Sequence, residues 1–262
     1  MKRYVYNLVL PFIVGALFIY LVWFVAVVLI SPPQYILPHP WSVLERLASM
    51  PSVFLHHTWI TTLAFGNGLL IGLVLAFALS LLTIRSRRLG AVISPLMVIV
   101  QSVPKIALAP LFIIWFGYGL APKVVIAALV SFFPLYINLV GGMRAVDSEL
   151  LDYAATLHLS PLTTILKIRL PFAMPFFFAG LKMAAIYSVV GAIVGEFVGS
   201  DKGLGFLIIQ GDLSFDSVLL FAALHILVAI GVILYLAVAL LEVWALRWKV
   251  GDGEDVGFMV TA

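Results

Sequence analysis

Four charged residues interrupt long hydrophobic stretches of the sequence: Lys105, Lys182, Glu196 and Glu242. A charge at bilayer depth costs about 2.5–3.5 kcal/mol unless it faces protein, water or a partner, so each is a candidate for contact with a polar solute. Glu242 stands near the end of its stretch and is interpreted as a surface residue. Lys182 can line a polar path or extend its stem to the lipid headgroups. Lys105 and Glu196 are better placed to line a central path or to pair with each other.

Two uncharged polar residues extend this group of candidates. Gln101 precedes Lys105 by four residues, and Pro104 lies between them. Because proline removes a backbone donor, irregular backbone at this depth is tolerated only where protein or a cavity surrounds it. Asn67 lies between two glycines and can face the same cavity or form a hydrogen bond between helices. The predicted translocation path therefore comprises Asn67, Gln101, Lys105, Lys182 and Glu196.

Residue sets typical of catalysis do not stand out in the sequence. There is no cysteine, no nucleophile with a neighbouring base and no carboxylate pair at a catalytic spacing. The adjacent His56 and His57 would point about 100° apart on a helix, which disfavours a shared metal ion. No G-x-x-x-x-G-K-[ST] phosphate loop occurs, so bound ATP is not expected. We expect neither enzymatic activity nor a metal or cofactor bound by this chain.

The composition places these residues in a membrane protein. The 262 residues are 64% hydrophobic and only 10% charged, outside the range of soluble domains. Six stretches are long enough to cross a bilayer as helices, at residues 7–30, 58–84, 91–116, 122–141, 172–197 and 217–246. The sequence therefore predicts an all-α polytopic protein, with one transmembrane domain at 1–250 and a flexible tail at 251–262. Glycines four residues apart, at Gly191, Gly195 and Gly199, predict close helix packing.

Basic residues set the predicted orientation. With the N-terminus inside, the cytoplasmic segments hold ten of them: Lys2, Arg3, Arg85, Arg87, Arg88, Arg144, Lys167, Arg169, Arg247 and Lys249. The outer segments hold three: Arg46, Lys123 and Lys202. Because Lys and Arg accumulate on the cytoplasmic side, this bias predicts that both termini are cytoplasmic. The first stretch is interpreted as an uncleaved span, since it exceeds the core of a signal peptide and no cleavage site follows.

The cytoplasmic segment at 142–171 is too long and too patterned for a simple connection. Asp147 can cap a first helix, and apolar residues follow at helical spacing. His158 occupies the position where a helix often ends in the left-handed conformation. Ser160 and Pro161 are typical of the cap and first residue of a second short helix. The apolar face of such a helix–turn–helix can lie on the membrane surface or bind a partner.

The residues Asp152, Tyr153, Ala154, His158, Ile168, Leu170 and Pro171 have the spacing of a known signature. It resembles the cytoplasmic signature of ABC importer permeases, in which Glu-Ala-Ala, three residues, Gly, nine residues and Ile-x-Leu-Pro follow one another. Tyr153 and His158 depart from it, and Pro171 marks the return to the membrane. The stretches VPKIALAPLFIIWFGYG (103–119) and GEFVGSDKGLGFLI (195–208) are similar to permeases of the nitrate/sulfonate/taurine type. The resemblance covers roughly residues 55–248.

This resemblance implies the fold of a type I ABC importer permease. The segment would form a coupling helix seated in a groove of an ATPase subunit, which it would contact through Asp152, Tyr153, Ala154, Leu157, His158, Leu159 and Ser160. ATP and Mg would bind to that subunit. The other implied partners are a second copy of this chain, a second ATPase subunit, an extracytoplasmic substrate-binding protein and the lipid of a bacterial inner membrane, with no nucleic acid. One set of spans is too few to enclose a wide path, which also favours a homodimer.

The sequence constrains the identity of the cargo less than it constrains the family. The resemblance favours a small anion such as a sulfonate, taurine or nitrate. A vitamin-like heterocycle (a thiamin pyrimidine precursor or riboflavin) and an aromatic acid are alternatives for the same machinery. Two other classes of protein stay open. An ion-coupled secondary transporter would need acids at mid-membrane, and a non-transporting scaffold would leave the proline-broken third stretch unexplained.

Overall fold

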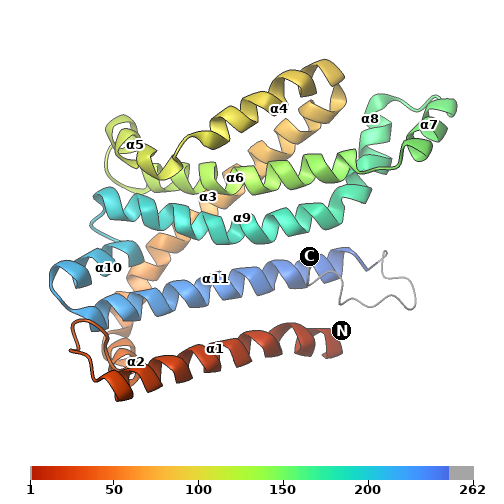
Figure 1. Ribbon diagram of the computed structural model, residues 1–262. Coiled ribbons are helices and arrows are strands. Elements are labelled where there is room, and N and C mark those ends of the chain that lie inside the picture. The colour runs from red at the N-terminus through yellow and green to blue at the C-terminus, as the bar shows by residue number, and fades with distance from the viewer. Residues whose placement is uncertain (1, 248–262) are drawn as a thin grey trace. The chain divides into compact units, whose positions relative to one another are not determined.

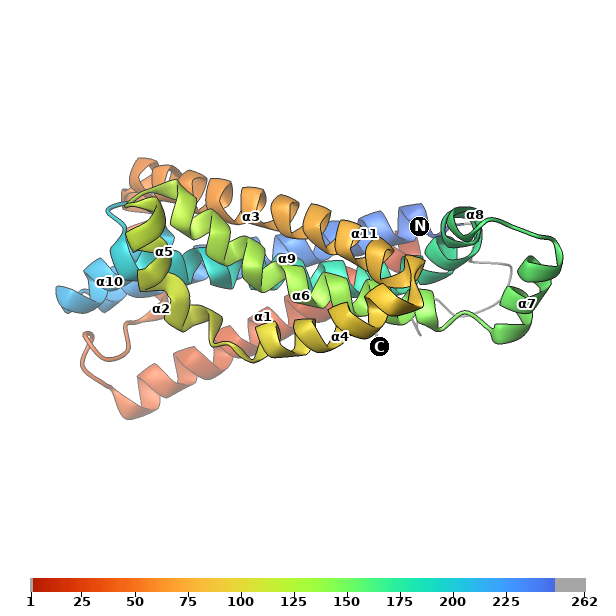
Figure 2. The same cartoon turned by 90° about the horizontal axis from the view of Figure 1, so that it is seen from above.

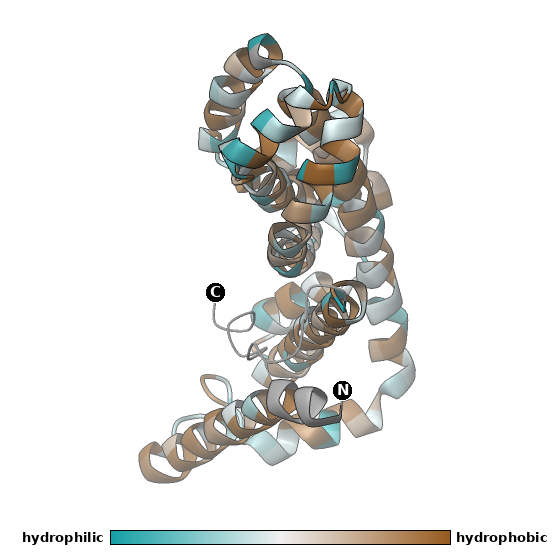
Figure 3. Cartoon of the chain, turned by 90° about the vertical axis from the view of Figure 1, so that its right-hand side faces the viewer, coloured by the Kyte–Doolittle hydropathy of each residue, from teal (hydrophilic) through white to brown (hydrophobic). Residues whose placement is uncertain are grey.

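The computed structural model describes residues 2–247, and it describes their side chains except at residues 2–8 and 87. These residues form helices joined by short loops, without a strand among them (Figures 1 and 2). Five helices are long and apolar enough to cross a membrane: α1 (Lys2–Ile30), α3 (Pro51–Arg85), α6 (Leu120–Arg144), α9 (Leu170–Gly199) and α11 (Ser217–Ala245). The number of spans rises to six if a bent pair of helices, Arg88–Ser102 and Lys105–Phe116, is counted as one span. Hydrophobic colouring predominates along them in Figure 3. The expected all-α membrane fold is confirmed, and the predicted tail at 251–262 lies outside the described residues.

The chain falls into two compact units, of which the first comprises Met1–Leu63 and Gly199–Ala262. Its described part holds α1, α2 (Pro40–Ser49), the start of α3, α10 (Leu204–Leu213) and α11. Helices α2 and α10 both pack on α11, and α1 contacts α2 and α11. The long helix α11 is therefore the centre of unit 1.

An ion pair ties α2 to the start of α11. Arg46 Nη1 donates to Asp216 Oδ2 at 2.6 Å, and both side chains are 30% exposed. Asp216 is also the N-cap of α11, because its Oδ1 accepts the backbone N–H of Leu219 at 3.0 Å. Burial raises the pKa of the Asp216 carboxyl, but the hydrogen bonds from Arg46 and the backbone outweigh it, so this pKa lies below its usual value. Asp216 is therefore charged at neutral pH, where it stabilises this end of unit 1.

Unit 2 comprises Ala64–Val198, and its helices α6 and α9 lie side by side (Figures 1 and 2). Glycines of α9 make this approach possible. A Cβ at Gly191 would stand 2.7 Å from Ala127 Cα, and a Cβ at Gly195 would stand 2.8 Å from Lys123 Cα. Both distances are shorter than packed atoms tolerate. The prediction that glycines four residues apart serve close packing is confirmed at these two positions.

The stretch predicted at 91–116 contains a sharp bend. Helix α4 (Arg87–Ser102) is followed by the 3₁₀ turn η1 (Lys105–Leu108) and helix α5 (Ala109–Phe116), at an angle of 77° to α4. Val103 and Pro104 are extended, because the residue before a proline avoids the helical region and proline has no N–H to continue the helix. Beyond the bend, η1 and α5 pack on α6.

The segment predicted to be cytoplasmic joins α9 (Leu170–Gly199) without a break. Helix α7 (Ser148–Thr156) leads to α8 (Pro161–Thr164), which continues through one π-helical turn, η2 (Ile165–Arg169), into α9. In this turn Leu170 N–H donates to Ile165 O. The wide turn accommodates Pro171, which has no N–H and whose ring would clash in a regular turn. The second short helix expected in this segment is therefore part of one helical segment that runs to Gly199.

Replacement of Asp216 by Asn should weaken unit 1. Asn preserves the N-cap but loses the ion pair with Arg46, so we expect a loss of about 0.5–1 kcal/mol in the free energy of unfolding at neutral pH. The folded-state pKa of Asp216 is lowered, so the wild-type advantage is complete above the ordinary aspartate pKa of about 3.9 and is lost as the pH falls through the folded-state value. Thermal unfolding of the wild type and the variant in detergent, at neutral and acidic pH, measures this difference in stability. Asp212→Asn, exposed at the end of α10, is the matched control. An equal loss in both variants would contradict the assignment.

Candidate functional site

A helical hairpin, residues 147–169, projects beyond the ends of α6 and α9 in unit 2 (Figures 1 and 2). Asp147 Oδ1 accepts the N–H of Glu149 at 3.0 Å and caps α7. Ser160 Oγ accepts the N–H of Thr163 at 3.2 Å and caps α8, with Pro161 as its first residue. The caps predicted at Asp147 and Ser160 are both confirmed.

The turn between the two helices is built around His158. This residue has a φ of 52°, in the left-handed region that the sequence predicts for it. Its N–H donates to Ala155 O at 2.9 Å, and the N–H of Leu159 donates to Ala154 O at 3.2 Å. These two bonds form a Schellman motif, which satisfies carbonyls left over at the end of α7. The hairpin therefore has a fixed backbone and presents its side chains in a defined arrangement.

Six of the seven predicted docking residues are exposed: Asp152, Tyr153, Leu157, His158, Leu159 and Ser160. The seventh, Ala154, is only 2% exposed. A charged side chain at position 154 would therefore disturb the hairpin itself before it affected any contact. The exposed leucines of the hairpin that the predicted docking set omits are Leu150, Leu162 and Leu166. Their helical spacing in the sequence is the signal that could have included them.

Arg169 attaches the hairpin to α6. Its Nη1 donates to Met143 O at 2.9 Å, in the last turn of α6, where backbone carbonyls have no helical partner. From the sequence, Arg169 is predicted only to contribute to the charge bias that sets orientation. The two residues are 26 positions apart, and no local pattern reveals their contact.

Lys105 lies directly after the bend that follows α4. Its Nζ donates to Gln101 O at 3.0 Å and stands 4.5 Å from the centre of the Phe133 ring, within cation–π range. Within residues 2–247 it forms no ion pair, so the alternative in which Lys105 and Glu196 pair with each other is not realised. Gln101 and Asn67, the uncharged path candidates, are exposed.

Glu196 instead faces Lys123. The Lys123 Nζ and Glu196 Oε1 atoms are 3.7 Å apart, and the two side chains are 4% and 0% exposed. The pair joins α6 to α9 beside Gly195, whose missing side chain lets Lys123 approach. Lys123 stands at the start of the predicted stretch 122–141 and counts there among the outer basic residues. In the structure it is buried in the first turn of α6, which begins at Leu120, and its pairing with Glu196 is not predicted from the sequence.

Lys182 and Glu242 are also buried, at 8% and 4% exposed. For Glu242 this corrects the interpretation as a surface residue. Val238 and Leu246, about one turn away on either side, are buried as well. Glu242 therefore lies on a buried stripe of α11. The burial of Lys182 disfavours the alternative in which its stem reaches the headgroups. The assignment of Asn67, Gln101, Lys105, Lys182 and Glu196 to a translocation path stays a prediction.

The rings of the adjacent histidines of unit 1 pack against each other edge to face. The rings of His56 and His57 are 5.5 Å apart and nearly perpendicular, at 89°. His57 Nδ1 accepts the N–H of Gly203 at 2.9 Å, so this ring holds the loop before α10. In the part of the chain that the structure describes, no three His, Cys, Asp or Glu side chains gather as a metal site would require.

Long apolar helices, joined in unit 2 by a capped helical hairpin, define a multi-pass membrane protein. Residues 68–247 match the family described as the binding-protein-dependent transport system inner membrane component, and the chain belongs to that family. It is a transport permease of the ABC class and not an enzyme. The family predicted from the cytoplasmic signature is thereby confirmed.

Similar proteins agree with this assignment. The chain is 41% identical to a Haemophilus influenzae protein that bears the name of an ABC transporter permease, over 86% of this chain and 91% of the relative. It is 32% identical to the formylaminopyrimidine transport permease of Halalkalibacterium halodurans, over 89% and 93%. It is 33% identical to a Bacillus subtilis permease named for aliphatic sulfonates, over 71% and 65%. An inward-facing structure of the MetNI methionine ABC transporter shares the fold, with a TM-score of 0.65 and 19% identity over 74% of this chain and 96% of that chain.

Removal of one member of the buried Lys123–Glu196 pair should cost more than removal of both. Lys123→Met or Glu196→Leu leaves the opposite buried charge without this counter-ion, so we expect either variant to lose about 3–5 kcal/mol in the free energy of unfolding. The double variant Lys123→Met/Glu196→Leu should recover most of that loss. Thermal unfolding in detergent measures all three.

The control for this cycle is the exposed pair Asp201–Lys202, whose charged atoms are 3.9 Å apart with side chains 85% and 55% exposed. Lys202→Gln should have little effect, because water screens such pairs. Losses that simply add in the double variant would show that Lys123 and Glu196 do not depend on each other.

Proposed function

We propose that this permease is the membrane subunit of an ATP-driven importer, in which two copies enclose the path and each hairpin docks on an ATPase subunit. The observation that carries the proposal is the hairpin. Its backbone is fixed by two caps and a Schellman turn, yet it exposes Tyr153, Leu157 and Leu162 at 63%, 55% and 59%. Apolar surface of this kind, rimmed by polar residues, usually marks a contact with another protein. The resemblance to importer permeases supports an ATPase groove as the partner.

The hairpin is attached to the spans at two places, so its displacement would reach the membrane. One helical segment runs from Pro161 through η2 to Gly199, and Arg169 holds the end of α6. Closure of the two ATPase subunits would draw the two hairpins together and open the path outward, and reopening would reverse the change. ATP and Mg would bind to the ATPase subunits, because this sequence carries no phosphate loop.

The remaining components follow from the same proposal. The family description names dependence on a binding protein, which we place on the outer side, opposite the hairpins. The bias of basic residues supports cytoplasmic termini and a cytoplasmic hairpin in a bacterial inner membrane. The second copy of the chain would complete a path that one set of spans cannot enclose.

We infer that the cargo is a small heterocycle of the thiamin-precursor class. The formylaminopyrimidine permease aligns with 89% of this chain and 93% of its own length, whereas the permease named for aliphatic sulfonates aligns with 71% and 65%. A small anion such as a sulfonate, taurine or nitrate is the second candidate. The half-buried ammonium of Lys105, which forms no ion pair with a described residue, favours it.

A charge placed on the exposed face of the hairpin should separate the permease from its ATPase. Leu157→Asp replaces an apolar contact by a carboxylate, and we expect association at least about 30-fold weaker, as for a central interface residue. Co-purification of the ATPase subunit and ATP-dependent uptake into proteoliposomes should both fall, while the amount of inserted permease stays the same.

The matched control is Leu213→Asp, because Leu213 is 76% exposed, lies at the end of α10 in unit 1 and is not part of the hairpin. It should co-purify with the ATPase like the wild type. Undiminished ATPase binding by Leu157→Asp would refute docking through this face.

The identity of the cargo can be tested by measuring the affinity of candidate ligands for the partner binding protein. Calorimetric titration should show tight binding of a formylaminopyrimidine and binding of taurine or an alkanesulfonate about 100-fold weaker or more, because a site built for ring donors and acceptors rejects a ligand that lacks them. The reverse order would favour the anion, and in that case Lys105→Met should lower uptake while Lys105→Arg preserves it.

A further inference from the structure

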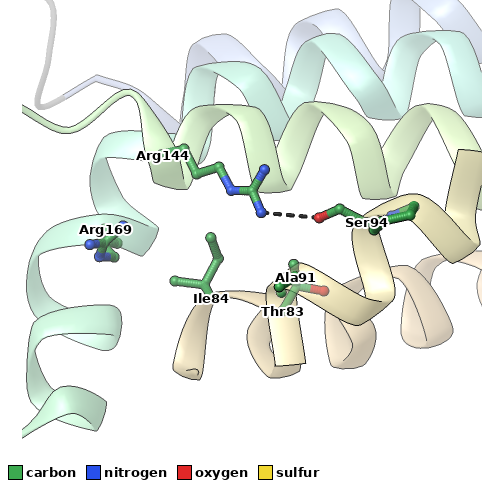
Figure 4. A pocket seen from close by; sticks show the side chains of 8 residues that line it. Thr83, Ile84, Ala91, Ser94, Arg144 and Arg169 are labelled. Atoms are coloured by element: carbon green, nitrogen blue, oxygen red, sulfur yellow. Dashed lines mark hydrogen bonds between the residues drawn. The ribbon is translucent and has the colours of Figure 1, made fainter. Parts of the chain in front are cut away.

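A pocket of about 480 Å³ lies where α3, α4, α6 and η2 meet in unit 2 (Figure 4). Eight residues line it, and none of them is acidic. Two are arginines, Arg144 and Arg169, which come from different elements. The pocket is large enough for a small polar ligand. It includes none of the exposed docking residues of the hairpin and none of the predicted path residues.

The two guanidinium groups keep most of their donors available. Arg144 Nη2 donates to Ser94 Oγ of α4 at 3.1 Å, as the dashed line in Figure 4 shows. Arg169 Nη1 donates to Met143 O at 2.9 Å. A guanidinium carries five N–H donors in a planar fork, so each arginine can still form paired hydrogen bonds with an oxyanion.

Neither arginine has a carboxylate partner in the described chain. No ion pair involves Arg144 or Arg169 among residues 2–247. Arg169 is half-buried, and a cation partly withdrawn from water is stabilised by an opposite charge. Because guanidinium groups match the oxygen spacing of phosphate, the pocket has the chemistry of a phosphate site.

Gly90 keeps the space beside Arg144 open. A Cβ at this position would stand 2.8 Å from Thr83 O and 3.6 Å from Arg144 Nη2. Any side chain here would therefore force α3 and α4 apart beside the guanidinium. Arg85, the last residue of α3, and Arg88, in the first turn of α4, are exposed nearby in the sequence. In the predicted orientation this end of unit 2 lies at the cytoplasmic headgroups.

We propose that this pocket binds a phosphate group, supplied by the headgroup of an anionic phospholipid in the cytoplasmic leaflet. Basic pockets between membrane helices on this side attract such headgroups through charge and hydrogen bonding. A phosphodiester between Arg144 and Arg169 would link the ends of α6 and η2, next to the hairpin. The proposal rests on the predicted orientation and is independent of the cargo and of ATPase docking. Inorganic phosphate shares the same chemistry without acyl chains.

Native mass spectrometry of the full chain in detergent, with added phosphatidylglycerol, tests the proposal. We expect Arg144→Gln or Arg169→Gln to lower lipid affinity about five-fold, and the double variant about 25-fold. The matched control, Arg85→Gln/Arg88→Gln, removes the same charge outside the pocket lining and should lower lipid affinity far less than the pocket double variant does. Phosphatidylcholine, which has no net charge, should bind all variants equally.

Arg169→Gln also removes the hydrogen bond that holds the hairpin to α6, so a second variant tests the pocket without this effect. Ala91→Phe fills the pocket from the exposed face of α4 without a change in charge, and it should lose phosphatidylglycerol while its melting temperature stays near that of the wild type. A melting temperature that rises with inorganic phosphate in lipid-free protein, and no longer rises in the double variant, would assign the site to free phosphate. Equal retention of phosphatidylglycerol by the wild type, the double variant and Ala91→Phe would overturn the proposal.

Discussion

Helices α6 and α9 lie in close contact at positions where glycine has no side chain, such as Gly191 and Gly195, and this contact organises unit 2. Near the start of α6 it brings Lys123 to Glu196, so that two charges are buried together instead of singly. At the other end of α6 it places Arg169 against the last carbonyls of that helix. The ion pair, the anchored hairpin and the arginine pocket thus all depend on one closely packed helix pair.

The hairpin combines a rigid backbone with an exposed apolar surface. Local sequence fixes the backbone, through Asp147, the left-handed His158 and Ser160. Tertiary contact fixes its position, through Arg169. A surface that transmits motion needs both, because a loose loop would absorb a displacement and an unattached helix would not pass it on. This is the physical reason why the hairpin suits the coupling role that we propose for it.

The features that the sequence predicts correctly are those that local interactions along the chain determine. Hydropathy located the membrane-spanning helices, Pro104 predicted the broken segment, and caps and a left-handed residue located the turn of the hairpin. What the sequence does not reveal is burial, which depends on packing partners. Ala154 of the predicted docking set is buried within the hairpin, Lys123 is buried beside Glu196, and Glu242 is on a buried face. No pattern within one segment distinguishes these positions from exposed ones, because their neighbours across the fold decide them.

The π-helical turn at residues 165–169 has a consequence for how this architecture can vary. A single added residue in a helix rotates everything before it by about 100° about the helix axis while it lengthens the helix by only about 1.5 Å. The azimuth at which α7 and α8 leave the membrane is therefore set by one residue next to Pro171. An insertion or deletion here would re-aim the whole protruding surface and leave the hydrophobic thickness of the span almost unchanged. Relatives could in this way match differently shaped partners without a new transmembrane helix.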